Sequence, residues 1–412
     1  MCDTAGSNKL DIKTTIMELA FLSKSEKLNG TLKSTPESFI VEEISSDGKI
    51  IEINKPFTQA DSPPSQKYLH IALQKRNYST DRALKMLAGR LHIGKKRFSF
   101  TGTKDKVALA TQLVSCFDCK KEQLANISIT DIEILGSYYS NKPLSLGDHL
   151  GNRFTIKVEG KCDGKKVERI WQELGGKSIN YFGPQRFGSR NNTHKTGYFI
   201  LKGLFEDAVF EYLCGGEEDE SAGLRRELLQ TRDYVKALNA FPTHLRYERC
   251  MLDYLADKQR DFIGALRRLP RKLGMMLVHA SQSHLFNQYV SMRLHDNDLE
   301  PKENELVCGT NDYGFPDLGK KSNDEENGWL ACNVIGYDSE LNEFEKELLA
   351  EAGISKEDFK IKKIPEFSSS GSLRTMFMPI KDFAYDEKEN TFRFSLPKSG
   401  YATVVMDEFL KA

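Results

Sequence analysis

The chain has 412 residues, of which 39% are hydrophobic and 29% charged, a composition typical of a globular protein and not of a fibrous or disordered one. Because this length exceeds what one hydrophobic core usually holds, we expect two or three domains. The 59 basic and 59 acidic side chains cancel, so any nucleic-acid ligand would have to bind local basic surfaces.

The sequence offers no signal for a membrane or for secretion. No apolar run approaches the roughly 20 residues that cross a bilayer, and the first residues lack the basic start and apolar core of a signal peptide. The eight cysteines are scattered without the spacing of a disulfide framework, which favours reduced thiols. These observations predict a cytoplasmic protein with no membrane association.

The first third of the chain alternates between apolar and polar residues, as strands do. Residues 39–44, 68–73 and 154–158 each predict a strand with one buried face. Between the second and third strands, Thr80 is placed to cap a helix whose apolar residues recur at helical spacing. Residues 98–101 predict a short strand that leads into a charged turn.

The pattern changes from about residue 204 to 294, where apolar residues recur with a 3.6-residue period and predict a mostly helical region. Residues 303–327 are rich in Gly, Asn, Asp and Pro and predict an irregular connection, with a helix near 341–352 after it. A strand at 392–396 and a final helix at 399–410, opened by a Ser399 cap, end the chain. The sequence therefore predicts an α+β fold with a helical domain inserted into a sheet domain.

The charged turn contains the first candidate for chemistry. Asp105 stands between Lys104 and Lys106 in the segment Gly-Thr-Lys-Asp-Lys, directly after the short strand. Neighbouring cations are expected to keep the pKa of this carboxyl low, so that it stays ionised and can act as a nucleophile or a base without a metal. An ordinary solvated turn explains the same spacing.

A second segment, residues 180–190, interleaves aromatic, amide and arginine side chains with glycines: Asn-Tyr-Phe-Gly-Pro-Gln-Arg-Phe-Gly-Ser-Arg. Aromatic rings stack on bases, amides read base edges and arginines hold phosphates, so this composition suits RNA. A glycine-rich loop with its aromatic rings in the core is the alternative. The basic clusters 95–97 and 267–272 could follow an RNA backbone, or they could be solvated surface.

Other site patterns are weak or absent. Cys116 and Cys119 have the spacing of zinc ligands but lack a second pair, and residues 314–321 resemble a phosphate-binding loop with Lys321 in place of the required Ser or Thr. No HExxH pair, nucleophile elbow or dinucleotide fingerprint occurs. The sequence therefore predicts no metal site.

Three ordered blocks and the C-terminal segment carry a resemblance to the TruD family of pseudouridine synthases, in its archaeal and eukaryotic-like branch. The blocks are residues 33–43 (KSTPESFIVEE), the Gly-x-Lys-Asp-Lys/Arg block at 102–106, and the Asn-Tyr-Phe-Gly-x-Gln-Arg-Phe-Gly block at 180–188. Residues 399–403 are similar to the family's C-terminal segment. The resemblance covers most of the chain from about residue 30 onward and is weakest in the helical middle.

The resemblance implies a domain organisation. It implies a catalytic domain with a mixed or antiparallel sheet, in circularly permuted order, over residues 29–203 and 366–412. A mostly helical α+β insertion, specific to the family, would occupy residues 204–365. Residues 1–28 would form an N-terminal extension.

The resemblance also implies residue roles. The family's catalytic aspartate falls on Asp105, its active-site lysine on Lys33, and its active-site asparagine and aromatic residue on Asn180 and Phe182. Lys104, Gln185 and Arg186 would support the site or bind substrate.

The implied reaction is the isomerisation of uridine to pseudouridine in tRNA, at position 13 of the D-arm. It changes no redox state, so no cofactor is expected, and tRNA is the expected partner of a monomer that needs no other protein. Two other interpretations stay open: a non-catalytic RNA-binding protein or RNA chaperone that uses the same basic cleft, and a metal-dependent RNA-processing hydrolase, for which ligand clusters are missing.

Overall fold

The structure, a computed structural model, describes residues 18–32, 35–62, 67–322 and 328–411. The chain folds into two compact units. The sheet unit contains residues 21–180, 309–320 and 377–412, and the helical unit contains residues 1–20, 181–308 and 321–376, each as far as described. The units divide after residues 180 and 376, whereas the predicted domains divide after 203 and 365; the domain boundaries stay a prediction.

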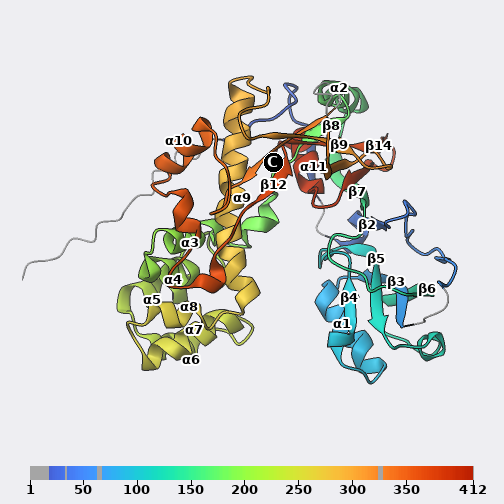
Figure 1. The fold of residues 1–412 in the computed structure, drawn as a ribbon. Coiled ribbons are helices and arrows are strands. Elements are labelled where there is room, and N and C mark those ends of the chain that lie inside the picture. Colours follow the sequence, from blue (N-terminus) through green and yellow to red (C-terminus); the bar gives the residue numbers. More distant parts are fainter. Residues whose placement is uncertain (1–17, 33–34, 63–66, 323–327, 412) are drawn as a thin grey trace, which may run out of the picture. The chain divides into compact units, whose positions relative to one another are not determined.

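Among the described residues, nine strands form the main sheet of the sheet unit (Figure 1). Its order is β14-β15-β7-β2-β5-β3-β6, with β1 on β7 and β4 on β5. The pair β2 and β5 is parallel and every other pair in it is antiparallel, so the sheet is mixed. The strands are β1 (Asn29–Leu32), β2 (Phe39–Ile44), β3 (Tyr68–Arg76), β4 (Phe98–Phe100), β5 (Leu109–Phe117), β6 (Ile132–Ser140), β7 (Gly151–Lys161), β14 (Lys381–Asp386) and β15 (Thr391–Pro397).

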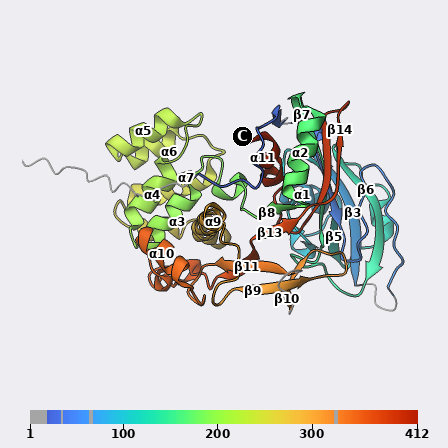
Figure 2. The same cartoon turned by 90° about the horizontal axis from the view of Figure 1, so that it is seen from above.

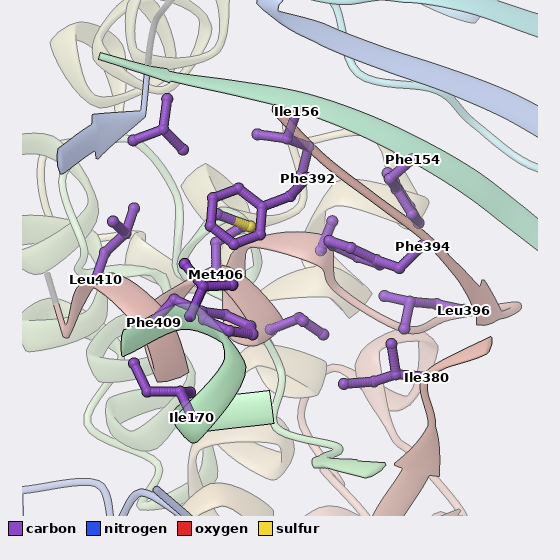
Figure 3. Packing of buried hydrophobic residues seen from close by; sticks show 14 of the residues in the cluster. Phe154, Ile156, Ile170, Ile380, Phe392, Phe394, Leu396, Met406, Phe409 and Leu410 are labelled. Atoms are coloured by element: carbon purple, nitrogen blue, oxygen red, sulfur yellow. The ribbon is translucent and has the colours of Figure 1, made fainter. Parts of the chain in front are cut away.

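Three helices bury the apolar residues of this sheet: α1 (Thr80–Arg90), α2 (Gly164–Leu174) and α11 (Ala402–Leu410). Figure 3 shows the core formed by α2 and α11, where Phe392 and Phe394 of β15 pack with Ile170 and Phe409. α1 covers a second cluster on β3 and β5. A short pair, β8 (Lys177–Ile179) with β13 (Phe377–Pro379), also belongs to the sheet unit.

In the helical unit, α9 (Arg271–His295) is a 25-residue helix with α3 packed beside it (Figure 2). The contact needs Gly197 on α3, because a Cβ there would lie 2.1 Å from the carbonyl oxygen of Leu277. β9, β11 and β12 form a small antiparallel sheet. The elements are α3 (Thr193–Leu201), α4 (Phe205–Cys214), α5 (Ala222–Thr231), α6 (Tyr234–Ala240), α7 (Arg246–Asp257), α8 (Phe262–Leu266), β9 (Leu306–Thr310), β11 (Trp329–Val334), α10 (Glu343–Glu351) and β12 (Ser372–Thr375).

The α+β class is confirmed, and three local predictions are wrong. Residues 303–327 contain β9 and β10 (Pro316–Lys321), where backbone pairing overrides a turn-rich composition. The cap of α1 is Ser79, whose hydroxyl accepts the Arg82 N–H at 3.3 Å, and Thr80 is the first helical residue. α11 begins after Tyr401, and its N-terminus has no side-chain cap.

Two further observations concern the described residues only. None of their seven cysteines is part of a disulfide, and Cys116 and Cys119 are both buried. None of their helices combines the length and apolarity that crossing a membrane requires.

Candidate functional site

The loop between β4 and β5 carries Asp105, and hydrogen bonds fix both ends of this loop. The Gly147 N–H donates to the carbonyl oxygen of Thr101 at 2.7 Å, and the Asn77 N–H donates to that of Ala108 at 3.1 Å. Between these ends, the Lys104 N–H donates to the Thr80 hydroxyl at 3.0 Å. The loop is therefore tied to the start of α1.

The side chain of Lys104 points into the protein and away from solvent. Its Nζ lies 2.7 Å from Oε2 of Glu43, and both side chains are almost completely buried. The same Nζ donates to Oδ1 of Asn152 at 2.7 Å. Lys104 is thus an internal anchor of the loop, bridging it to β2 and β7.

Glu43 has its own set of donors. Its Oε1 accepts the Leu113 N–H at 3.0 Å, and its Oε2 accepts the Thr101 hydroxyl at 2.8 Å. With Lys104 as the third donor, both carboxylate oxygens are satisfied, as a buried charge requires. The charge of Lys104 is therefore compensated inside the protein.

The carboxylate of Asp105 is arranged differently. More than a third of the residue's surface is exposed, and the carboxylate accepts no hydrogen bond from any residue that the structure describes. Desolvation by the surrounding protein raises the pKa of the Asp105 carboxyl, and the positive charges of Lys75 and Lys104 act in the opposite direction. The predicted low pKa is wrong in direction, because desolvation outweighs the neighbouring cations and Lys106 is not among the groups that shift it.

A further cation, Lys75 of β3, lies beside Asp105 although it is not part of the motif at residues 102–106. It is fully buried, and its Nζ donates to the backbone carbonyl oxygen of Asp105 at 2.7 Å. Burial lowers the pKa of Lys75 to about 8, against the opposing attraction of Asp105. The sequence could have revealed this lysine, because alternation along the strand places Lys75 on the same face as the buried residues Leu69, Ile71 and Leu73.

The ring of His149 leaves no room for a side chain at Gly102, the glycine of the Asp105 motif. A Cβ at Gly102 would lie 2.9 Å from Cε1 of His149, so a larger residue would displace the ring. Burial lowers the pKa of His149 to about 4, with Lys104 as the next cause. The imidazole is therefore neutral near pH 7 and adds no charge beside the loop.

The second group of site residues lies in the helical unit and centres on Phe182. The Phe182 N–H donates to Oδ1 of Asn287 at 2.8 Å, and Nδ2 of Asn287 donates back to the Phe182 carbonyl oxygen at 2.9 Å. One amide side chain on α9 thus fixes the backbone on both sides of the ring. The sequence gives no local signal for this, because 105 residues separate the partners.

Aromatic and cationic groups surround the half-buried ring of Phe182. Phe286 meets it edge to face, with ring centroids 5.6 Å apart. The guanidinium carbon of Arg374 lies 4.2 Å from the ring centre, and that of Arg186 lies 5.4 Å from it. Arg186 is held in turn by a 2.9 Å hydrogen bond from its Nε to the Ser283 hydroxyl.

The remaining predicted site residues are placed as follows. Asn180 is buried directly after β8 in the sheet unit, and Gln185 is exposed in the helical unit. Lys33 lies outside the described residues. The structure therefore brings Asp105 together with Lys104, and Phe182 together with Arg186, in two units that are each described by themselves.

The basic clusters are partly engaged in structural contacts. Lys95 pairs with Asp81, and Nε of Arg97 donates to the Phe117 carbonyl oxygen at 2.7 Å, while Lys96 is exposed. Arg267 pairs with Glu366 at 2.9 Å. Within the described ranges, no group of three or more metal-ligating side chains comes together, and Cys116 and Cys119 gain no further ligand.

Comparison with known proteins places the chain in a family. Residues 16–409 match the family described as tRNA pseudouridine synthase D (TruD). A probable tRNA pseudouridine synthase D of Methanococcus maripaludis is 36% identical over 402 residues, which cover 94% of this chain and 97% of that protein. One of Archaeoglobus fulgidus is 35% identical, covering 95% of this chain and 97% of its own.

A solved structure agrees with these relatives. The crystal structure of a putative tRNA pseudouridine synthase D from Methanosarcina mazei superposes with a TM-score of 0.74 at 30% identity, covering 97% of this chain and 98% of that one. The resemblance inferred from the three sequence blocks is thereby confirmed. The chain belongs to the TruD family of pseudouridine synthases and is an enzyme of that isomerase class.

Proposed function

We propose that this chain isomerises uridine to pseudouridine in tRNA, at position 13 of the D-arm, with Asp105 as the catalytic carboxylate. The observation that carries the proposal is the contrast between Asp105 and its loop. The loop is clamped by buried hydrogen bonds and by the ion pair of Lys104 and Glu43, while Asp105 is an exposed residue whose carboxylate accepts no hydrogen bond from the described residues. A rigid backbone with an accessible carboxylate is what a reaction at a single sugar carbon requires.

The proposed reaction breaks the bond between N1 and C1', turns the uracil, and joins C5 to the same C1'. The C5 proton is lost and N1 gains one, so product and substrate are isomers and no redox cofactor takes part. Two routes fit Asp105: attack of its carboxylate on C1', or assistance in removing a ribose proton. In both routes Asp105 then helps to remove the C5 proton after the new bond has formed.

The other residues have supporting roles in this proposal. Lys33 keeps Asp105 ionised and oriented, Asn180 positions the loop or the substrate, and Phe182 stacks on the target base, with Gln185 and Arg186 beside it. Lys104 supports the site from inside, as its ion pair with Glu43 indicates. The target base must leave its helical stack at a cost of a few kcal/mol, which stacking and phosphate contacts offset.

Two parts of the proposal concern the setting of the enzyme. The relatives' names include tRNA, which supports tRNA as the substrate. That the chain acts as a monomer in the cytoplasm, with no other protein required, stays a prediction.

Mapping pseudouridines in tRNA from cells with and without this protein tests the proposal. We expect the modification at position 13 to disappear with the protein and to return when the wild-type chain is restored. An unchanged pseudouridine map would favour the alternative of a non-catalytic RNA-binding protein or chaperone.

Phe182→Ala separates a stacking ring from a core ring. Because base stacking on an aromatic side chain contributes about 1–3 kcal/mol, we expect kcat/KM to fall by about 10- to 100-fold. Because the ring is only partly buried, the melting temperature should fall less than it does when a fully buried ring is removed. Parallel measurements of rate and of thermal unfolding check this.

Phe286→Ala is the matched control for Phe182→Ala, since Phe286 is only 1% exposed. Its loss should cost about 3–5 kcal/mol of stability, as for other buried phenylalanines. If Phe182→Ala lowers the melting temperature as much as Phe286→Ala does, Phe182 is a core residue and its proposed role is wrong.

A further inference from the structure

Lys75 is an unusual lysine because it is fully buried and forms no salt bridge with any residue that the structure describes. Its relative exposure is 0%, and among the described residues it forms no ion pair; its Nζ donates one hydrogen bond, to the Asp105 carbonyl oxygen. Taking an ammonium out of water costs several kcal/mol, and buried lysines are rare unless a carboxylate compensates them. A methionine would fill the same space without that cost.

The groups around the Asp105 loop differ in whether they contribute a net positive charge. Lys104 is neutralised by Glu43 at 2.7 Å, and His149 is neutral near pH 7. Lys75 therefore supplies a buried positive charge at the loop that no carboxylate pairs with among the described residues, whereas Lys106 is exposed to solvent. Its attraction lowers the pKa of Asp105 against the effect of burial, and Asp105 in turn favours the charged form of Lys75.

We propose that Lys75 is a positioning residue for the isomerisation: it holds the Asp105 backbone in place and supplies a buried charge that, in addition to the role proposed for Lys33, helps to keep the Asp105 carboxylate ionised beside RNA phosphates. This inference rests on the proposed role of Asp105. It assigns Lys75 two effects, one mechanical through its hydrogen bond and one electrostatic. The electrostatic effect can be measured separately.

Lys75→Met tests the electrostatic effect directly. The variant removes the charge and the hydrogen bond while keeping an unbranched side chain of similar length. An opposite charge within about 4–6 Å typically shifts a carboxyl pKa by one unit or more. We therefore expect the pKa of Asp105, followed by NMR with selectively ¹³C-labelled aspartate and assigned with Asp105→Asn, to rise by about one unit.

The pH dependence of pseudouridine formation should move with that pKa. A carboxyl group with a raised pKa ionises at higher pH, so the acid limb of the rate profile should shift upward by about one unit in Lys75→Met. On the acid limb we expect the rate of Lys75→Met to be about tenfold lower than the wild-type rate at the same pH, and near pH 7.5 we expect a smaller loss. The melting temperature should hold or rise, because a buried charge is removed.

Lys157→Met is the matched control, since Lys157 is an exposed lysine on β7 of the same sheet. It should leave both the Asp105 titration and the rate profile unchanged. Lys75→Gln is the second variant: it also removes the charge, retains a hydrogen-bond donor, and should show the same upward shift. If Lys75→Met does not fold, Lys75→Gln decides the question.

The inference is overturned if the pKa of Asp105 in the folded Lys75 variants equals the wild-type value. It is also overturned if the variants lose the same fraction of the rate at every pH. These outcomes differ from failure of the proposed function. If the proposed function is wrong, the wild-type chain forms no pseudouridine. The NMR titration still reports whether Lys75 controls the ionisation of Asp105.

Discussion

Asp105→Asn should abolish pseudouridine formation while leaving tRNA binding intact. Asparagine has nearly the same shape, but it can neither attack C1' as a carboxylate nor take up a proton. Because removal of a catalytic nucleophile typically costs several orders of magnitude, we expect the single-turnover rate to fall at least about 10³-fold. The measurement is pseudouridine formed per enzyme on a tRNA transcript.

Binding should be equal or slightly tighter in this variant, since an anion beside the phosphate backbone is removed. Stability should not fall either. The folded protein raises the pKa of Asp105, so its ionisation at neutral pH costs folding free energy, and asparagine carries no such cost. A filter-binding titration and a thermal melt of the same preparation check both points.

The combination of results decides between the hypotheses. Loss of product with normal binding and melting supports a catalytic Asp105. Wild-type rates in Asp105→Asn would exclude Asp105 as the catalytic carboxylate. If neither chain forms product although both bind tRNA, the protein is an RNA-binding protein without this activity. Activity that survives in EDTA would further exclude a metal-dependent hydrolase.

Five strands of the main sheet (β2, β3, β4, β7 and β15) and the helical character of residues 204–294 were predicted, mainly because their residues follow a simple period. Phe392 and Phe394 alternate with exposed or polar neighbours in β15, and Phe286, Tyr289, Val290 and Leu294 in the C-terminal half of α9 follow helical spacing. β9 and β10 were missed because their composition is that of turns, and strand pairing depends on partners elsewhere in the chain.

Contacts among the candidate site residues were predictable only where those residues lie within one motif. Asp105 and Lys104 are neighbours in sequence, and Phe182 and Arg186 are four apart. Asn287 and Arg374 reach Phe182 from distant segments, which no local pattern can reveal.

Lys75 and Glu43 are intermediate cases. Each continues a buried alternating row, Lys75 after Leu73 and Glu43 after Val41, so the phase of the strand predicts a buried charge. What the sequence could not supply is the partner of each charge. The structure pairs Glu43 with Lys104 and leaves Lys75 at the backbone of Asp105.

Breaking the buried pair of Glu43 and Lys104 should destabilise the protein strongly. Glu43→Gln leaves the Lys104 ammonium buried without its carboxylate, and Lys104→Met leaves the carboxylate without its cation. Either change should cost about 3–5 kcal/mol of unfolding free energy, as for other buried pairs that lose one partner. Urea unfolding followed by circular dichroism provides the measurement.

The double variant Glu43→Gln with Lys104→Met should lose less than the sum of the single losses, because it contains no unpaired buried charge. A coupling of about 0.5–3 kcal/mol is expected for side chains in direct contact. Lys157→Met is again the matched control: its partner Glu389 is exposed, so this pair should contribute less than about 1 kcal/mol. If the single losses at Glu43 and Lys104 are as small as in this control, or simply add in the double variant, the pair does not anchor the Asp105 loop.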